Sequence, residues 1–265
     1  MSRIGARLLL LLSAALMPQA ARAGAWLAPE GHGQVVVTNT ASTARKAFDA
    51  NGTPQPTPRY SKTEVQALIE YGLTDWLTGI AIPSFQHVDI AAPINAERNG
   101  FGNSEFGARA RIMQQSNWVL SAQATMRIPG TYDTGNPAAV GYTGLDIDLR
   151  ALFGASFVLG GLPSFVDVQL AQRFRTGGPP NEARIDLTFG MRPAPQWLVL
   201  AQQFNVISEG AGSGLFLSNN YHKLQMSAVY DITPKWSLQG GAFTTFAGTN
   251  AFQENGIITS VWYRF

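Results

Sequence analysis

The chain has 265 residues and no cysteine, so it can form neither a disulfide nor a thiolate metal site. Only 14% of its residues are charged, whereas 11% are aromatic and 27 are glycine, a composition that favours β structure. The formal net charge of the whole chain is +2.

The N-terminus predicts a cleaved secretory signal over residues 1–23. Early arginines precede an apolar run from Leu8 to Met17, and the small-x-small triplet Ala-Arg-Ala ends at Ala23. The run is too short for an anchor, which needs roughly 20 apolar residues. We place the mature N-terminus at Gly24. The signal carries three arginines and no acid, so the mature net charge is about −1, which gives no indication of nucleic-acid binding.

Alternation at period 2 along the mature chain predicts strands with one apolar and one polar face. No apolar run of 18 residues follows residue 23, so no spanning helix is predicted. Pro83 lies inside the third strand, where we expect a bulge because proline lacks the ladder N–H. The predicted strands are 33–42, 61–72, 76–88, 103–113, 117–128, 143–155, 164–175, 183–192, 196–208, 219–231, 235–247 and 256–265.

The connections between these strands alternate between short turns and longer polar loops, such as 43–60 and 208–220. An even strand number with this alternation is typical of outer-membrane barrels. The sequence therefore predicts an all-β, antiparallel, up-and-down transmembrane β-barrel of about 12 strands over residues 24–265. Both termini would lie on the periplasmic side, in the outer membrane of a Gram-negative bacterium.

The polar faces of the strands predict the lining of a lumen, because they are rich in arginine and acids rather than in mobile lysine. Cations outnumber acids on these faces. One interpretation is a structural salt-bridge network that holds the wall. The other is a narrow polar path with mild anion preference. The lumen candidates are Lys62, Glu64, Glu105, Arg109, Arg111, Arg127, Asp146, Asp148, Arg150, Asp167, Arg173, Arg175, Arg184, Asp186 and Lys223.

Aromatic residues gather near the predicted short turns. Amphipathic rings are favoured at a membrane–water interface, so these residues predict a girdle at the periplasmic side. The alternative is aromatic packing beside hairpins. The girdle candidates are Tyr71, Trp76, Trp118, Trp197, Tyr230, Trp236, Tyr263 and Phe265.

The stretch YGLTDWLTGIAIPSF, residues 71–85, resembles the repeated hairpin of a family of outer-membrane proteins associated with the phenol meta-pathway of degradation. The stretch DITPKW, residues 231–236, resembles a later copy of the same turn, whereas Trp76 replaces the basic residue often found there. The resemblance implies a transporter-like barrel in the outer membrane. It implies no substrate, because the family's function is thinly defined.

Catalysis is not predicted. A twelve-stranded phospholipase would need a histidine and a serine two residues apart, but Gln34, Asp89 and Leu224 follow the three histidines at that spacing. The pair His87 and Asp89 is more typical of a solvated rim than of a metal site. We therefore expect no enzyme, no metal and no cofactor.

The sequence favours a passive outer-membrane channel for small solutes of unknown identity. The alternative is a closed structural barrel that binds partners through its extracellular loops 43–60 and 208–220. The other expected partners are outer-membrane lipid and the outer-membrane assembly machinery. That machinery would recognise the C-terminal strand, in which Phe265, Tyr263 and Val261 face lipid and Arg264, Trp262 and Ser260 face the lumen.

Overall fold

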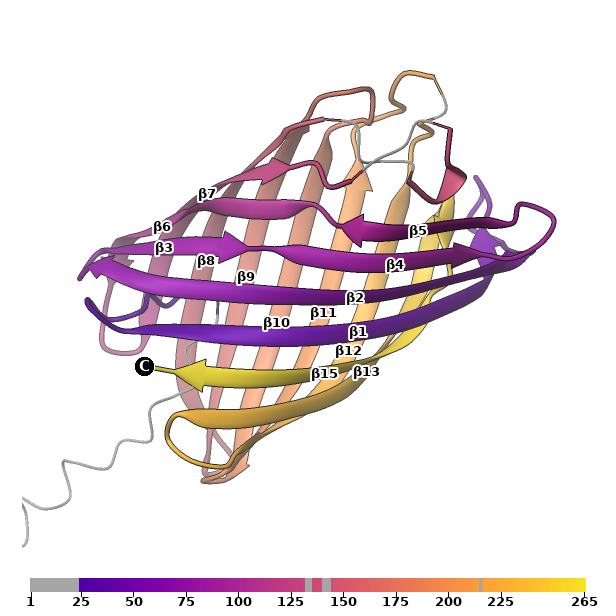
Figure 1. The fold of residues 1–265 in the computed structure, drawn as a ribbon. Coiled ribbons are helices and arrows are strands. Elements are labelled where there is room, and N and C mark those ends of the chain that lie inside the picture. The colour runs from indigo at the N-terminus through magenta and orange to yellow at the C-terminus, as the bar shows by residue number, and fades with distance from the viewer. Residues whose placement is uncertain (1–23, 132–134, 140–143, 215) are drawn as a thin grey trace, which may run out of the picture.

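The chain forms a closed antiparallel β-barrel, described by a computed structural model for residues 24–131, 135–139, 144–214 and 216–265 (Figure 1). The predicted signal lies outside these residues. The chain runs along the wall twelve times, and we call each run a pass. Nine passes are single strands, and three are each divided into two shorter strands. The prediction of a twelve-stranded barrel is confirmed.

The strands follow the chain around the wall, each pairing with the next pass. A short 3-10 helix, Pro137–Ala139, lies between β7 and β8. The strands are β1 Gly33–Phe48, β2 Pro54–Thr74, β3 Leu77–Ile82, β4 Ser84–Ile90, β5 Ala96–Phe101, β6 Ser104–Gln114, β7 Trp118–Ile128, β8 Asp146–Leu159, β9 Leu162–Arg175, β10 Glu182–Ala194, β11 Trp197–Ser208, β12 Asn220–Asp231, β13 Trp236–Thr249, β14 Ala251–Phe252 and β15 Asn255–Arg264.

The seam between the first and last strands closes the wall. Strands β1 and β15 pair continuously from Gln34 opposite Arg264 to Thr43 opposite Asn255. One residue beyond, Gly33 and Phe265 exchange two backbone hydrogen bonds of 2.9 and 3.0 Å. In hydrocarbon an open strand edge would leave unpaired peptide groups, each costing several kcal/mol. The pairing of β1 with β15 therefore leaves no open edge along these residues.

The predicted loop 43–60 is wrong in extent. Strand β1 continues to Phe48 and β2 begins at Pro54, so that the turn covers only 49–53. Phe48 pairs with Pro54 and Lys46 with Pro56, whereas the pairing of β2 with β4 begins only at Tyr60. Proline is tolerated on a strand edge, where its missing N–H costs no ladder bond. Pro54, Pro56 and Pro58 therefore lie within β2 and not in a loop.

Two neighbouring strands are interrupted at the same height. The third pass breaks at Pro83 into β3 and β4, as expected there, while the Pro83 carbonyl still accepts the Ala67 N–H at 3.1 Å. The fourth pass breaks at residues 102–103. Its first strand, β5, lies in the stretch between 88 and 103 that was predicted to be a loop. Gly102 donates its N–H to the Ser84 carbonyl at 2.8 Å, and a side chain there would collide with Ser84.

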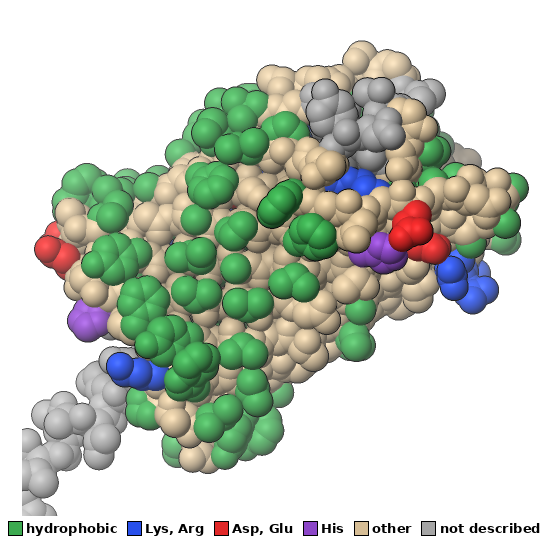
Figure 2. Space-filling model, viewed as in Figure 1, with side chains coloured by type: hydrophobic (Ala, Val, Ile, Leu, Met, Phe, Trp, Pro, Cys, Tyr) green, Lys and Arg blue, Asp and Glu red, His purple; other side chains and the backbone are tan. Residues whose placement is uncertain are grey.

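The outer surface of the wall is apolar. Figure 2 shows hydrophobic side chains spread over the visible face, with charged groups toward the two ends of the barrel. Phe106, Leu149, Leu170 and Val261 are among the exposed apolar side chains. Such a surface is stable only against lipid, so it is the lipid-facing side of a membrane barrel. No helix among the described residues is long and apolar enough to cross a membrane.

Deletion of Phe265 should reduce assembly of the barrel in the outer membrane more than refolding of the purified protein in detergent. The deletion removes the two hydrogen bonds with Gly33 and the ring that stacks on Tyr71 and Tyr263. Heat-modifiable mobility in gels measures the folded fraction in both settings. Phe265→Tyr keeps the ring and should assemble normally; an equal loss for both variants would contradict the role given to the terminal ring.

Candidate functional site

The strongest candidate site is the lumen, because charged side chains meet there across strands that are not neighbours. Arg109 on β6 lies 3.0 Å from Glu70 on β2, although β3 separates their strands. Arg173 on β9 reaches Glu105 on β6 at 3.2 Å. Such contacts form only on the concave side of a barrel, so these polar faces point inward.

The largest charged group spans β6 to β10, in the half of the lumen away from the short turns. Arg173 pairs with Asp148 at 3.0 Å, and Arg150 contacts both Asp148 and Asp186. Acidic and basic residues alternate at directly paired positions on β6, β7, β8 and β9: Glu105, Arg127, Asp146 and Arg175. Arg175 also pairs with Glu182 at 2.7 Å. We call this set the charged network.

A second charged group lies on β2, β12 and the C-terminal pass. Lys62 pairs with Glu64 at 3.1 Å, and Lys223 pairs with Glu254 at 2.6 Å. Ser84 donates a hydrogen bond to Glu64 at 2.6 Å. Glu254 was missed from the sequence because it precedes the predicted strand 256–265 and falls in the break between β14 and β15.

Two predicted lumen cations differ from the rest. Arg111 lies at the periplasmic turn, 3.8 Å from the exposed Asp75, and belongs to the rim rather than to the charged network. Arg184 on β10 is partly exposed, and no carboxylate of the described residues comes within 4.0 Å of its guanidinium. Since Asp231 and Glu254 add acids to the inner face, the excess of cations counted from the sequence shrinks. Arg184 therefore lacks a direct ion pair, although Asp186, Glu182 and Asp148 act on it electrostatically from farther away.

The N-terminal segment, residues 24–32, enters the lumen in the half nearer the short turns, which is the predicted periplasmic side. Its backbone is held by wall side chains: Ser121 donates to the Ala25 carbonyl at 2.6 Å, and Arg109 donates to the Trp26 carbonyl at 3.2 Å. The Ala28 N–H donates to the Thr78 hydroxyl at 3.1 Å. The sequence did not predict this placement, because the segment has no strand periodicity.

Trp26 anchors an apolar cluster inside the wall, which includes Trp262, a residue predicted to face the lumen. Its ring meets Phe165 edge-on, with centroids 5.9 Å apart. A side chain at position 154 would collide with that ring. The close approach of β8 to Trp26 therefore requires glycine at this position. The other members, Val36, Leu198, Leu200, Val229 and Trp262, are nearly fully buried. A continuous apolar run, as in WLVL of β11, hides this inward patch from a period-2 analysis.

A cavity of about 620 Å³ opens on the periplasmic side of the segment. Ala28, Pro29 and His32 of the segment form part of its wall. Arg192 pairs there with Asp231 at 2.9 Å, and Arg264 lies 3.5 Å from the same carboxylate. We call this cavity the periplasmic vestibule. The segment thus lies between the vestibule and the charged network.

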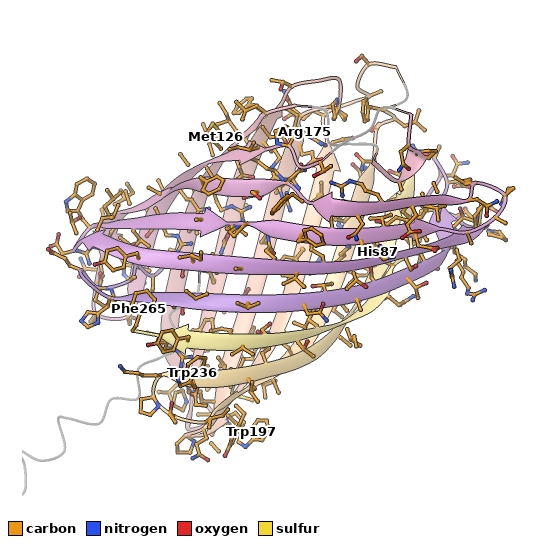
Figure 3. The ribbon with its side chains drawn as sticks, in the orientation of Figure 1. His87, Met126, Arg175, Trp197, Trp236 and Phe265 are labelled. Atoms are coloured by element: carbon orange, nitrogen blue, oxygen red, sulfur yellow. The ribbon has the colours of Figure 1, made fainter. Side chains whose placement is uncertain are left out.

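The predicted girdle residues share the end of the barrel that carries the short turns. Figure 3 shows Trp197, Trp236 and Phe265 at that end, and Arg175 and His87 toward the other. The rings meet in pairs, Trp197 with Tyr230 at 4.9 Å and Trp236 with Tyr263 at 4.5 Å. Tyr71 and Trp76 are also exposed, and Trp118 packs beside Phe153. Their place at a membrane interface stays a prediction.

Among the described residues, no group of three or more His, Asp or Glu side chains could hold a metal ion. His87 lies 3.7 Å from Glu97 at the exposed rim, and Nδ1 of His222 is 2.7 Å from the Asn205 side-chain oxygen. Within the described part of the chain, neither histidine is hydrogen-bonded to a side-chain hydroxyl. The geometry gives no support to a hydrolytic site.

The sequence profile of the family described as "Putative MetA-pathway of phenol degradation" matches residues 57–265. The fold is similar to a COG4313 outer membrane channel from Pseudomonas putida F1, with a TM-score of 0.78, 17% identity, and coverage of 92% of this chain and 99% of that one. The NanC porin matches with a TM-score of 0.55 and 8% identity, over 87% of this chain and all of that one (100%).

The translocator domain of the autotransporter NalP from Neisseria meningitidis matches with a TM-score of 0.55 and 12% identity, over 98% of this chain and 94% of that one. No curated protein matches the chain. At these identities the structural similarity concerns the fold alone. Because the same fold occurs in a porin and in a translocator domain, the cargo has to be inferred from the lumen.

Asp148→Asn should destabilise the barrel by about 3 kcal/mol, because it removes a buried carboxylate shared by two arginines and leaves Arg173 with Glu105 alone and Arg150 with Asp186 alone. Urea unfolding of the lipid-reconstituted protein, followed by tryptophan fluorescence, measures this change. Asp75→Asn removes an exposed rim carboxylate and should change little. Equal unfolding midpoints for both variants and the parent would show that the charged network does not stabilise the wall.

Proposed function

We propose that this chain, which belongs to the family described as "Putative MetA-pathway of phenol degradation", is an outer-membrane channel for small solutes. The observation that carries the proposal is that an internal segment, not the wall, separates the periplasmic vestibule from the charged network. Four side chains hold the segment's backbone, so its displacement would join two polar compartments without opening the barrel. No cofactor or turnover chemistry is needed.

The arginine-rich lumen would bind and guide solutes mainly through Arg184. The arginines of the charged network already form ion pairs with carboxylates. Substituting those carboxylates, or reversing the charge of the arginines, would destabilise the barrel wall. Arg184 is close enough to Arg173 to act on it electrostatically and has no acid within ion-pair distance in the described chain, although Asp186, Glu182 and Asp148 act on it from farther away. A fixed, unmatched cation favours anions in a narrow pore. This supports a mild anion preference set at one position.

The family description suggests which solutes to test first. Phenol and the carboxylates formed on its degradation are small, and the lumen offers both an apolar surface at Trp26 and a cation at Arg184. An aromatic carboxylate would use both features, whereas phenol would use the apolar surface alone. Swelling of liposomes that contain the protein compares their entry rates.

The alternative function is a closed barrel that acts through its extracellular surface. The long β1–β2 hairpin favours it, because residues 54–56 of β2 pair with β1, whereas the pairing of β2 with β4 begins only at Tyr60. A strand edge of this kind can bind another strand, although Pro54, Pro56 and Pro58 weaken that edge. A folded barrel without conductance would support this alternative.

Trp26→Ala should raise single-channel conductance in planar bilayers several-fold, because it removes the largest side chain of the segment from the lumen. Deletion of residues 24–31 should raise it further. Trp236→Ala, on the outer surface, serves as the control and should leave the conductance unchanged. If folded, heat-modifiable barrels of all these variants conduct no ions, the channel function is wrong.

Arg184→Glu should shift the ion preference of the pore toward cations, as measured by the reversal potential in a salt gradient. Arg184→Lys keeps the charge and should retain the preference of the parent. Arg111→Glu changes a rim charge outside the lumen and should have a smaller effect than Arg184→Glu. An unchanged reversal potential for Arg184→Glu would exclude this residue as the selectivity determinant.

A further inference from the structure

Asp167 is a buried carboxylate that lacks a cation. Only 2% of the residue is exposed, and its two oxygens accept hydrogen bonds from the Ala25 N–H and from Gln169, each at 2.6 Å. Within the described chain, no ion pair of 4.0 Å or less involves it. Every other carboxylate of the charged network has such a partner.

The nearest arginines do not fill this role. Arg109 and Arg150 act on Asp167 electrostatically, but only from beyond ion-pair distance. Arg109 is committed to Glu70, and Arg150 to Asp148 and Asp186. A buried ionised carboxylate without a paired cation is costly, so the site is short of one positive charge.

Gly24 lies directly against this carboxylate. It has a φ of +79°, and a Cβ at this position would lie only 2.1 Å from Oδ2 and 2.3 Å from Cγ of Asp167. Any other residue would therefore collide with the carboxylate. The α-nitrogen is about 2.5 Å from the Cβ position by standard bond geometry, so it lies within about 4.6 Å of Oδ2. In an uncleaved chain this nitrogen is a neutral amide.

We propose that hydrolysis of the Ala23–Gly24 bond by a signal peptidase creates the missing cation, and that the α-ammonium of Gly24 pairs with Asp167. Water adds across the peptide bond, leaving a carboxylate on Ala23 and an ammonium on Gly24. Removal of the signal thus completes a latch that fixes the N-terminal segment in the lumen. Two independent observations converge on the same residue: the Ala-Arg-Ala triplet ends just before Gly24, and the unpaired carboxylate lies against it.

The inference concerns processing of the chain and does not depend on what passes through the barrel. The intact mass and N-terminal sequence of protein purified from outer membranes should identify Gly24 as the first residue. A mature chain that starts elsewhere would overturn the proposal.

The pairing is tested with mature chains, refolded with either a free or an acetylated N-terminus. Acetylation removes the charge and should lower the folding equilibrium constant about tenfold, since it leaves the buried carboxylate unpaired. In Asp167→Asn the same acetylation should have little effect on the folding equilibrium constant. The substitution has already removed the ion pair between Gly24 and Asp167 that acetylation would break. Glu254→Gln, which removes a lumen carboxylate of the second charged group, should retain the full tenfold effect. An undiminished acetylation effect in Asp167→Asn contradicts the pairing.

If Asp167→Asn does not fold, the pairing can be tested in the parent protein by the rate at which the Gly24 amine is acylated. The Gly24 amine of the folded barrel should react with an acylating reagent at least about tenfold more slowly than in the unfolded chain, whereas Lys235 at the exposed turn should react at similar rates in both. Equal rates for the Gly24 amine in the two states would overturn the latch. None of these measurements uses conductance, so failure of the channel function and failure of the latch are distinguishable.

Discussion

The structure depends on one constraint: each peptide group in the hydrocarbon of a bilayer must find its hydrogen-bond partner within the protein. Pairing of β1 with β15 meets this constraint by removing the last open edge. A closed wall of twelve passes then divides the side chains into two sets. Period-2 alternation sends one set to lipid and the other into a confined interior, and every functional feature of this chain follows from what that interior holds.

The interior of this barrel is occupied in two ways. Acids and arginines from β6 to β10 neutralise each other in the extracellular half. In the periplasmic half the N-terminal segment brings Trp26 against Phe165. These ion pairs favour the salt-bridge interpretation of the charged network, and we propose that selectivity depends on Arg184, which has no direct ion pair in the described chain.

Sequence patterns predicted what a local period can encode. The strands, the break at Pro83 and the orientation of Val261 and Trp262 follow from alternation and from proline's missing N–H. The N-terminal segment could not be predicted, since its position depends on contacts of Ala25 with Ser121 and Asp167, far away in the chain. The hydrophobic residues Trp26 and Leu27, directly after a signal-like stretch, were the only hint. The length of the β1–β2 hairpin was underestimated because its prolines suggest a loop, whereas proline is tolerated on a strand that has a partner on one side only.

The central claim is that the N-terminal segment lies inside the closed barrel, against β7 and β9. Cysteines at Ala25 and Ser121 test it most directly, because the chain has no other cysteine and the two residues are joined by a 2.6 Å hydrogen bond. In outer membranes, oxidation or a short thiol crosslinker should join Ala25→Cys to Ser121→Cys in nearly all folded molecules, whereas Ala25→Cys with Ser156→Cys should stay unlinked. Absence of the first crosslink in folded barrels would contradict the account.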